Sequence, residues 1–193
     1  MPGVEQPIPQ PESPYEASRR VNNVLRLGTV AEVRLAAPAR CRVQTGDNLT
    51  DWLPWLTLRA GGRAGGTAWW PPVVGEQVLL LAPGGDLGQA VVLPGVFSDE
   101  RPQASTTAGA MRLDWSESDH LEYLPGQHLR LQFGDTTVVL GADAITMHAG
   151  GGTVQLDASG LRGEPDVVSG GVSLREHLHT AVTSGSELSG PPA

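Results

Sequence analysis

The sequence has few of the residues that would crosslink a small fold or build a large aromatic core. Its 193 residues include one cysteine, Cys41, with two phenylalanines and two tyrosines. A single cysteine excludes an intrachain disulfide framework and any site with several cysteine ligands. Because Cys41 lies in an alternating apolar stretch, we predict a buried structural thiol rather than a reactive one.

Long apolar segments and a secretion signal are also missing. No run approaches the ~20 apolar residues of a membrane-spanning helix, and the N-terminus lacks the basic-then-apolar pattern of a signal peptide. We therefore expect synthesis in the cytoplasm. Hydrophobic residues make up only 39% of the chain, beside 25 glycines and 16 prolines. This composition predicts a turn-rich, all-β protein with a small core per chain.

The first 26 residues predict an extended arm followed by a short helix. Residues 1–14 carry five prolines and no apolar pattern of their own. Val21, Val24 and Leu25 then recur at i, i+3 and i+4 before Gly28, which is the spacing of one helix face.

Residues 27–98 predict a compact β-barrel. Apolar residues alternate in five segments separated by glycine, proline and aspartate turns: 27–35, 40–44, 53–59, 77–82 and 89–97. Five strands in about 70 residues suit an OB-fold barrel. Four of the five tryptophans lie here, Trp52, Trp55, Trp69 and Trp70. We expect them to pack within the domain rather than to stack on a ligand.

A repeat fills residues 111–158 of a predicted shaft at 111–170, after a polar linker or collar at 99–110. Short apolar units recur at intervals of about eight residues, with turn formers between them. Alternation with a period of two places the apolar side chains on one face of a sheet. These positions are Met111, Leu113, Trp115, Leu121, Tyr123, Leu129, Leu131, Phe133, Val138, Leu140, Ile145, Met147, Val154 and Leu156.

Such a sheet cannot bury its apolar face alone. Each unit offers two or three inward residues, so the face must stack on copies of itself or on another sheet. A single-chain solenoid is one solution, and three chains wound about a common axis are the other. Six units are few for a solenoid, which favours the trimer.

Residues 171–193 follow the repeat and carry a His-x-His pair, His177 and His179. In an extended chain residues i and i+2 point the same way, so both imidazoles can approach one point. The pair alone is a weak signal, but three chains on a threefold axis would bring six imidazoles together. An octahedral set disfavours zinc and suits Fe(II), in a closed, structural site. We expect His120, His128 and His148, within the repeat, to be outward-facing polar positions.

Two other classes of function have less support. The carboxylates Asp114, Glu117, Asp119 and Glu122 cluster at one turn, but no pocket-forming segment, nucleophile elbow or phosphate-binding loop accompanies them. We interpret them as a solvated turn and predict no enzymatic activity. OB folds often bind single-stranded nucleic acid. A net charge of −8 per chain, and thus −24 for three chains, would repel phosphates.

Three barrel motifs and the C-terminal segment resemble a known family. The motifs are TDWLPWLTLRAG at 50–61, WWPPVVGEQVLLL at 69–81 and PGGDLGQAVVLPG at 83–95. Together with His177-Leu-His179 and Ser189-Gly-Pro-Pro192, they resemble the P2-type phage baseplate assembly protein V family, the central spikes of contractile tails, and the matching spikes of R-type pyocins. The resemblance runs from about residue 20 to the end of the chain.

This resemblance implies a homotrimer with an OB-fold collar, an intertwined triple-stranded β-helix and an apex at 171–193. Iron would be held by His177 and His179 of all three chains, with chloride or calcium as further axial ions. The collar would bind the tail hub protein, and sheath contraction would drive the tip against the host outer membrane. The site of action would be a virion tail baseplate or a pyocin particle, assembled in the host cytoplasm. A tip protein of a related injection or secretion system is the alternative, and an OB-fold ligand-binding module is the less favoured one.

Overall fold

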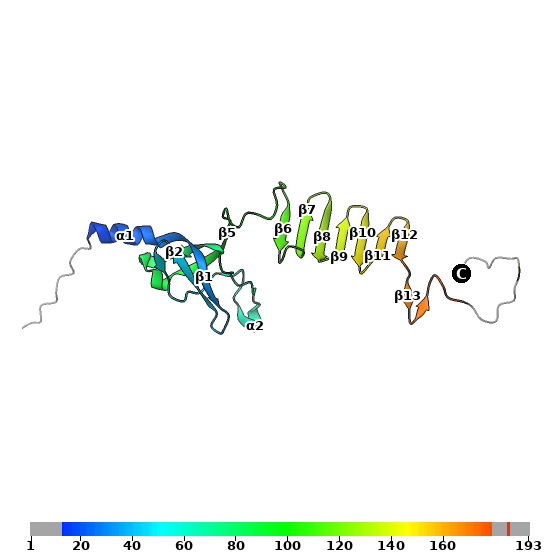
Figure 1. Ribbon diagram of the computed structural model, residues 1–193, viewed down its shortest axis with the longest axis horizontal. Coiled ribbons are helices and arrows are strands. Elements are labelled where there is room, and N and C mark those ends of the chain that lie inside the picture. The colour runs from blue at the N-terminus through cyan, green and yellow to red at the C-terminus, as the bar shows by residue number, and fades with distance from the viewer. Residues whose placement is uncertain (1–12, 179–184, 186–193) are drawn as a thin grey trace, which may run out of the picture. The chain divides into compact units, whose positions relative to one another are not determined.

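The computed structural model describes residues 13–178 and residue 185. It divides into two compact units, Met1–Gln103 and Ala104–Ala193, which we treat one at a time. Antiparallel strands are the main regular structure of both units, so the all-β prediction is confirmed (Figure 1). The predicted proline-rich arm lies, up to residue 12, outside the described residues.

The first unit begins with helix α1, Pro14–Val24. Ser13 caps its N-terminus by accepting a hydrogen bond from the backbone N–H of Tyr15 (3.3 Å), and Pro14 occupies the first helical position, where no N–H is needed. The backbone turns extended at Leu25, where strand β1 starts. The structure therefore contains the short helix that the spacing of Val21, Val24 and Leu25 predicts.

A five-stranded antiparallel sheet follows, with the strand order β3-β2-β1-β4-β5. Its strands are β1 (Leu25–Arg34), β2 (Arg40–Thr45), β3 (Asn48–Leu49), β4 (Gln77–Leu81) and β5 (Val91–Val96). A short helix, α2 (Gly62–Gly65), and two 3-10 turns, η1 (Pro83–Gly85) and η2 (Leu87–Gln89), complete the unit.

The segment around Leu53 closes this sheet into a barrel. Leu53 and Cys41 exchange backbone hydrogen bonds of 2.8 and 3.0 Å, and two residues later Trp55 forms a parallel bridge with Val92. The segment thus joins β2 to β5. The predicted strand 53–59 is therefore wrong as a regular strand. Pro54 has no N–H to donate to a ladder, which leaves isolated bridges in its place.

The barrel encloses the core of the first unit. Nine apolar side chains are buried there: Val30, Cys41, Val43, Leu53, Val78, Leu80, Ala82, Ala90 and Val92. Burial raises the pKa of the Cys41 thiol to about 11, so the thiol stays protonated at neutral pH. The prediction of a buried structural thiol is confirmed.

Helix α1 packs against the loop that contains η1, and one glycine permits the close approach. Gly85 has a φ of +74°, and a Cβ atom there would overlap the backbone of Arg20. Glycine is therefore needed at this position both for its backbone conformation and for the contact. This contact fixes the end of α1 on the barrel.

The second unit is a meander of seven antiparallel strands in which each strand pairs with the next in sequence (Figure 1). The strands are β6 (Met111–Asp114), β7 (His120–Leu124), β8 (His128–Phe133), β9 (Thr136–Gly141), β10 (Ala144–Ala149), β11 (Gly152–Asp157) and β12 (Gly160–Glu164). The repeat predicted the first six. A small hairpin, β13 (Val168–Ser169) with β14 (Val172–Ser173), follows.

We predict that Thr50→Val destabilises the first unit by about 1–3 kcal/mol, because it removes the partner of a buried donor. The Thr50 hydroxyl accepts the Val43 N–H at 3.0 Å and donates to the Asp51 carbonyl at 2.9 Å. Urea unfolding followed by tryptophan fluorescence measures this, since four of the five tryptophans lie in this unit. Thr50→Ser keeps the hydroxyl and is the control. Equal stability of the valine variant and the unsubstituted chain would contradict the prediction.

Candidate functional site: the apolar sheet face and the apex

Two cross-strand rows of apolar side chains cover one face of the seven-stranded sheet. Strand register places directly opposite residues on the same face, and the pairing is continuous from β6 to β12. The first row is Met111, Tyr123, Leu129, Leu140, Ile145, Leu156 and Leu161. The second row is Leu113, Leu121, Leu131, Val138, Met147 and Val154. The alternation in the sequence predicted every member except Leu161.

The first row is open to solvent in a single chain, and the second row is partly so: Leu113 and Met147 are exposed, whereas its other members are half-buried. In the first row the exposed fraction of the residues runs from 36% at Leu129 to 66% at Leu161. Trp115 and Phe133 extend the same apolar surface and stack with ring centroids 6.1 Å apart. A continuous exposed apolar surface of this kind is a binding surface in soluble proteins.

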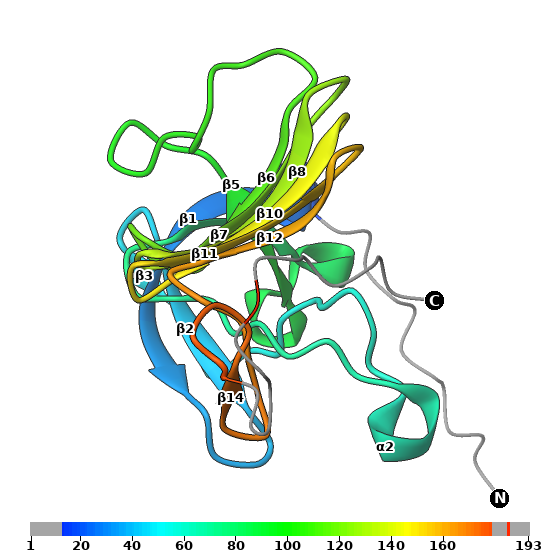
Figure 2. The ribbon, with the colours of Figure 1, turned by 90° about the vertical axis from the view of Figure 1, so that its right-hand side faces the viewer.

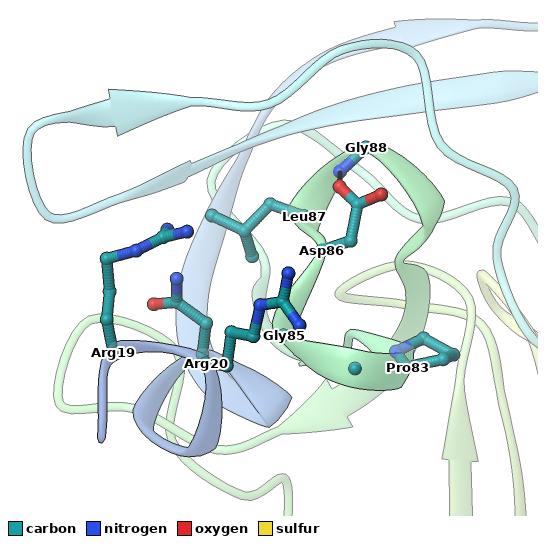
Figure 3. Close-up of a pocket in the computed structure, with 9 residues that line it drawn as sticks. Arg19, Arg20, Pro83, Gly85, Asp86, Leu87 and Gly88 are labelled. Atoms are coloured by element: carbon teal, nitrogen blue, oxygen red, sulfur yellow. Dashed lines mark hydrogen bonds between the residues drawn. The ribbon is translucent and has the colours of Figure 1, made fainter. Parts of the chain in front are cut away.

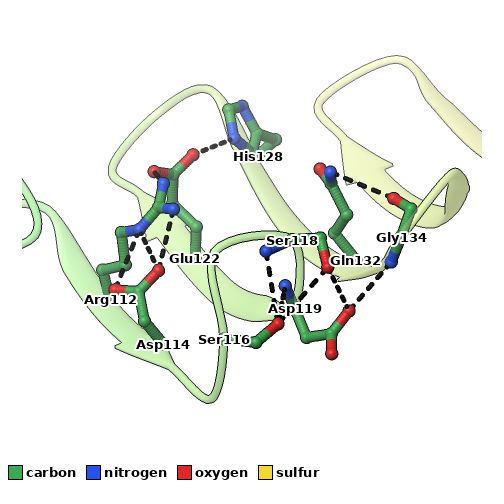
Figure 4. Close-up of polar contacts among 9 residues, drawn as sticks. All are labelled: Arg112, Asp114, Ser116, Ser118, Asp119, Glu122, His128, Gln132 and Gly134. Carbon is green, nitrogen blue, oxygen red and sulfur yellow. Dashed lines mark hydrogen bonds and ion pairs between the residues drawn. The ribbon is translucent and has the colours of Figure 1, made fainter.

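The opposite face carries charged and polar side chains in register. Arg112, Glu122 and Arg130 lie opposite one another on β6, β7 and β8. The Arg112 guanidinium donates to Asp114 Oδ1 (2.9 Å) and to Glu122 Oε2 (3.1 Å), and Glu122 Oε1 contacts His128 Nε2 at 3.1 Å (Figure 4). These side chains tie three neighbouring strands together.

The histidines of the repeat all lie on this polar face. His128 contacts Glu122, and the Nδ1 atom of His148 lies 3.2 Å from the Thr153 hydroxyl. His120 is opposite Asp114 and Gln132 but is buried, with 7% of its surface exposed. Within residues 13–178 and 185, no group of three or more His, Cys, Asp or Glu is arranged to hold a metal ion.

The carboxylates near the β6–β7 turn serve structural contacts. Asp119 Oδ1 accepts the Gly134 N–H at 2.9 Å (Figure 4). This hydrogen bond is the largest cause of the lowered pKa of Asp119, and a hydrogen bond from Ser116 is the second. Hydrogen bonds from His128, which has the larger effect, and from Arg112 lower the pKa of Glu122. Glu117 is exposed. Asp119 and Glu122 are thus built into the sheet, whereas the sequence suggested only a solvated turn.

The apex segment begins with the β13–β14 hairpin and leads to His177. Asp166 Oδ1 accepts the backbone N–H groups of Val167 (2.7 Å) and Arg175 (3.1 Å), and a hydrogen bond from Ser173 is the largest cause of the lowered pKa of Asp166. The His177 N–H donates to the Ser173 carbonyl at 3.1 Å, which closes a turn. His179 lies outside the described residues, so only the first imidazole of the predicted pair has a described position.

The His177 ring is held in an orientation that suits a metal ligand. Its Nδ1 lies 3.0 Å from the Ser173 carbonyl oxygen and 3.1 Å from that of Leu174. Carbonyl oxygens only accept hydrogen bonds, so Nδ1 carries a proton. A backbone carbonyl on one ring nitrogen is the usual support of a histidine that binds metal through the other.

The barrel unit also has an open pocket beside α1. Arg19 and Arg20 line it on the helix side, and the loop of residues 83–88 lines the other (Figure 3). Arg19 is engaged by Glu16, with 2.6 Å between Nη2 and Oε1. The pocket holds no nucleophile, and its one carboxylate, Asp86, caps the backbone N–H of Gly88.

The first unit and the apex match known families. Residues 26–97 match the type VI secretion system/phage-baseplate injector OB domain, which confirms the OB-fold prediction. Residues 171–193 match the GpV apex motif. The chain therefore carries matches to both an injector OB domain and an apex motif.

A phage spike protein is similar to this chain. The spike protein of Escherichia phage P2 is 47% identical to this chain over 110 residues, which cover 57% of this chain and 50% of the relative. The matched region thus spans about half the length of that relative. The resemblance to P2-type baseplate spikes that the sequence motifs indicated is confirmed.

No helix in the described part of the chain is long and apolar enough to cross a lipid bilayer.

We predict that Glu122→Gln weakens the acid sensitivity of the second unit. The lowered pKa of Glu122 means that its contribution to stability is present above about pH 4.5 and is lost as pH falls through the folded-state pKa. Thermal melts by circular dichroism at several pH values between neutrality and pH 3 should show a shallower loss of stability in the variant. Glu117→Gln, at an exposed position in the turn that precedes β7, should keep the slope of the unsubstituted chain. An unchanged slope for Glu122→Gln would contradict the prediction.

Proposed function

We propose that three copies of this chain form the central spike of a contractile tail baseplate. The continuous apolar face of β6–β12 supports this proposal most directly, because one chain leaves it exposed. Three such sheets around a common axis would turn their apolar rows toward one another and their charged rows toward water. The likeness to the phage P2 spike protein supports the same role.

The trimer is favoured over a single-chain solenoid by the strand connectivity. The described sheet is a plain meander, in which each strand turns back beside its predecessor and no strand passes beneath another. A solenoid needs coils that cover one another within the chain. The face therefore needs other chains as cover.

A trimer of this kind suits a needle that carries axial load. Neighbouring strands are joined by backbone hydrogen bonds from β6 to β12, and the apolar rows run across all seven strands. Contacts between chains would oppose local unfolding of any one of them. We propose that the needle is driven against the host outer membrane when the tail sheath contracts.

The barrel unit would connect the spike to the rest of the baseplate. Its match to the injector OB domain supports an attachment role, with the tail hub protein as the proposed partner. A role without catalysis agrees with the family of its relative. A net charge of −8 disfavours nucleic acid as a partner. We place the protein in a virion tail baseplate or a pyocin particle. A related secretion device is the second candidate, because the matched family includes type VI secretion systems.

At the apex, His177 and His179 of three chains would hold one metal ion, which we propose is iron. The Nδ1–H contacts of His177 support this role, because a backbone carbonyl on one ring nitrogen is the usual support of a histidine that binds metal through the other. A bound ion would link three chain ends and so oppose fraying at the tip. Chloride or calcium on the axis remains a prediction from the resemblance.

We predict that the purified chain has three times its 20.3 kDa mass in solution, as measured by light scattering. Ile145→Asp should weaken this trimer, because it places a charge on the apolar face. Thr146→Asp is the matched control, since Thr146 is the adjacent residue on the opposite face of β10. A monomeric mass for the unsubstituted chain would overturn the spike proposal.

We predict that elemental analysis finds about one transition-metal ion for three chains, as expected for one shared six-imidazole site. Replacing both histidines, His177→Ala with His179→Ala, should remove the metal and leave the trimer mass unchanged, because the sheet faces hold the chains together. His148→Ala, within the shaft, should retain the metal. A chain without bound metal in its native preparation would refute the apex site while leaving the trimer untouched.

A further inference from the structure

One wall of the barrel is apolar on its outer as well as its inner surface. Strands β1, β4 and β5 pair so that Leu25, Leu81 and Val91 form one outward row, and Leu27, Leu79 and Leu93 form a second. The inward positions between them include Val78, Leu80 and Val92, which are fully buried. Strands that are apolar on both surfaces are typical of sheets covered on both sides. We call these two rows the outer apolar wall.

The rest of the barrel shows what a water-facing surface looks like in this fold. On β2 the inward residues Cys41, Val43 and Thr45 are buried, but the outward positions are Arg40, Arg42 and Gln44. Arg42 pairs with Glu32 at 2.8 Å, and the guanidinium of Arg34 lies 4.7 Å from the Trp52 ring centroid. The outer apolar wall has no such polar side chains. Leu25 and Leu27 are nevertheless 57% exposed in the single chain.

A projecting arm, residues 56–70, adds to this apolar surface. Backbone bonds between Arg59 and Ala68 (2.8 Å) and between Gly61 and Gly66 (2.9 Å) hold it as a hairpin with α2 at its tip. Figure 2 shows α2 at the end of loops that stand away from strands β1 and β2. Leu58 is 94% exposed, and Trp69 and Trp70 are more than half exposed. Trp69 contacts the Trp55 ring, with the centroids 5.9 Å apart, so the expectation that all four tryptophans pack within the domain is met only in part.

The arm and the outer apolar wall meet in one groove, which is lined by Leu56, Leu58, Trp69, Trp70, Val73 and Leu93, among others. Glu76 is the only charged residue among the groove residues. Its carboxylate is engaged within the fold, where it accepts the N–H groups of Val73 (3.0 Å) and Gly95 (3.1 Å). The groove therefore fits an apolar protein surface rather than a charged ligand.

The chain path indicates which protein covers this surface. Strand β5, which supplies part of the outer apolar wall, leads directly into the segment that connects to the shaft. Arg101 fixes the start of this segment at the groove, with bonds to the carbonyl oxygens of Val74 (2.9 Å) and Gly75 (3.1 Å). Residues 98–110 span at most about 45 Å. A trimeric shaft would therefore hold three barrel units at a high local concentration.

We infer that the projecting arm of one copy packs on the outer apolar wall of the next copy around the threefold axis. A cyclic threefold contact joins two different surfaces of each subunit, and the arm and the wall are two such surfaces. This inference rests on the proposed trimer. Trp69, Trp70 and Leu58 are the expected anchors, since large apolar side chains dominate interface energies.

Site-specific photocrosslinking of the full-length chain tests the inference. With p-benzoylphenylalanine in place of Leu58, illumination should shift the 20.3 kDa band on a denaturing gel to two and three times that mass. Peptide mapping should place the crosslinks on residues 25–27, 77–81 or 91–93 of another copy. The same probe in place of Gln44, an exposed residue on the polar side of the barrel, is the control and should give only the single-chain band.

The outcomes separate this inference from the spike proposal. A trimeric mass by light scattering without crosslinks from position 58, or with equal crosslinks from position 44, overturns the arm-to-wall contact and leaves the trimeric shaft intact. Crosslinks that map to residues 111–178 of another copy also overturn it, because the arm would then serve the shaft. A monomeric mass overturns both proposals.

Discussion

The apolar face of the seven-stranded sheet is the constraint on which the proposed assembly depends. Its side chains lie in register from one strand to the next, so the apolar surface continues along the sheet. Completing the burial of a half-exposed aliphatic side chain contributes on the order of 1 kcal/mol. Repeated along two rows in three chains, that contribution exceeds the cost of bringing the chains together. This burial is the physical basis of the proposed trimer, in which the second unit would be one part of a shared core.

The charged rows on the other face make this arrangement specific. A shift of one residue in strand pairing would exchange the two faces of a strand. In β7 such a shift would turn Glu122 into the apolar core and separate it from Arg112 and His128. The cost of a buried unpaired carboxylate is much larger than the contribution of an exposed ion pair. The network of Figure 4 thus fixes register more than it adds stability.

The sequence predicted the shaft well because its strands face different environments on their two surfaces. Alternation located Met111 to Leu156 on one face, and the turns fell where glycine and aspartate occur. It missed β12, in which Leu161 is the only large apolar residue and Gly163 takes the second position. It also mistook 53–59 for a strand, since the alternation of Leu53 and Trp55 is real but Pro54 prevents a ladder.

The sequence was least informative where apolar residues face outward. In the barrel, the run Val78-Leu-Leu-Leu81 reads simply as a strand, and only the register shows that Leu79 and Leu81 lie on the outer surface. The same holds for Trp69 and Trp70. As large aromatic residues they were expected in the core, but they lie on the arm and are more than half exposed. For the apex, the pattern of His177 and His179 predicts a ligand pair, yet the supporting carbonyls of Ser173 and Leu174 follow from a turn that the pattern does not contain.

The two apolar surfaces differ in a way that suggests an order of assembly. The shaft face, through which we propose that three chains join, extends over seven strands, whereas the arm and the outer apolar wall form a smaller and more irregular surface. Contacts of modest size become effective once a tether raises the local concentration of the partners. The barrel contact would then follow shaft formation rather than drive it. This order would keep the exposed tryptophans of single chains from forming stable complexes before the shaft has selected two correct partners.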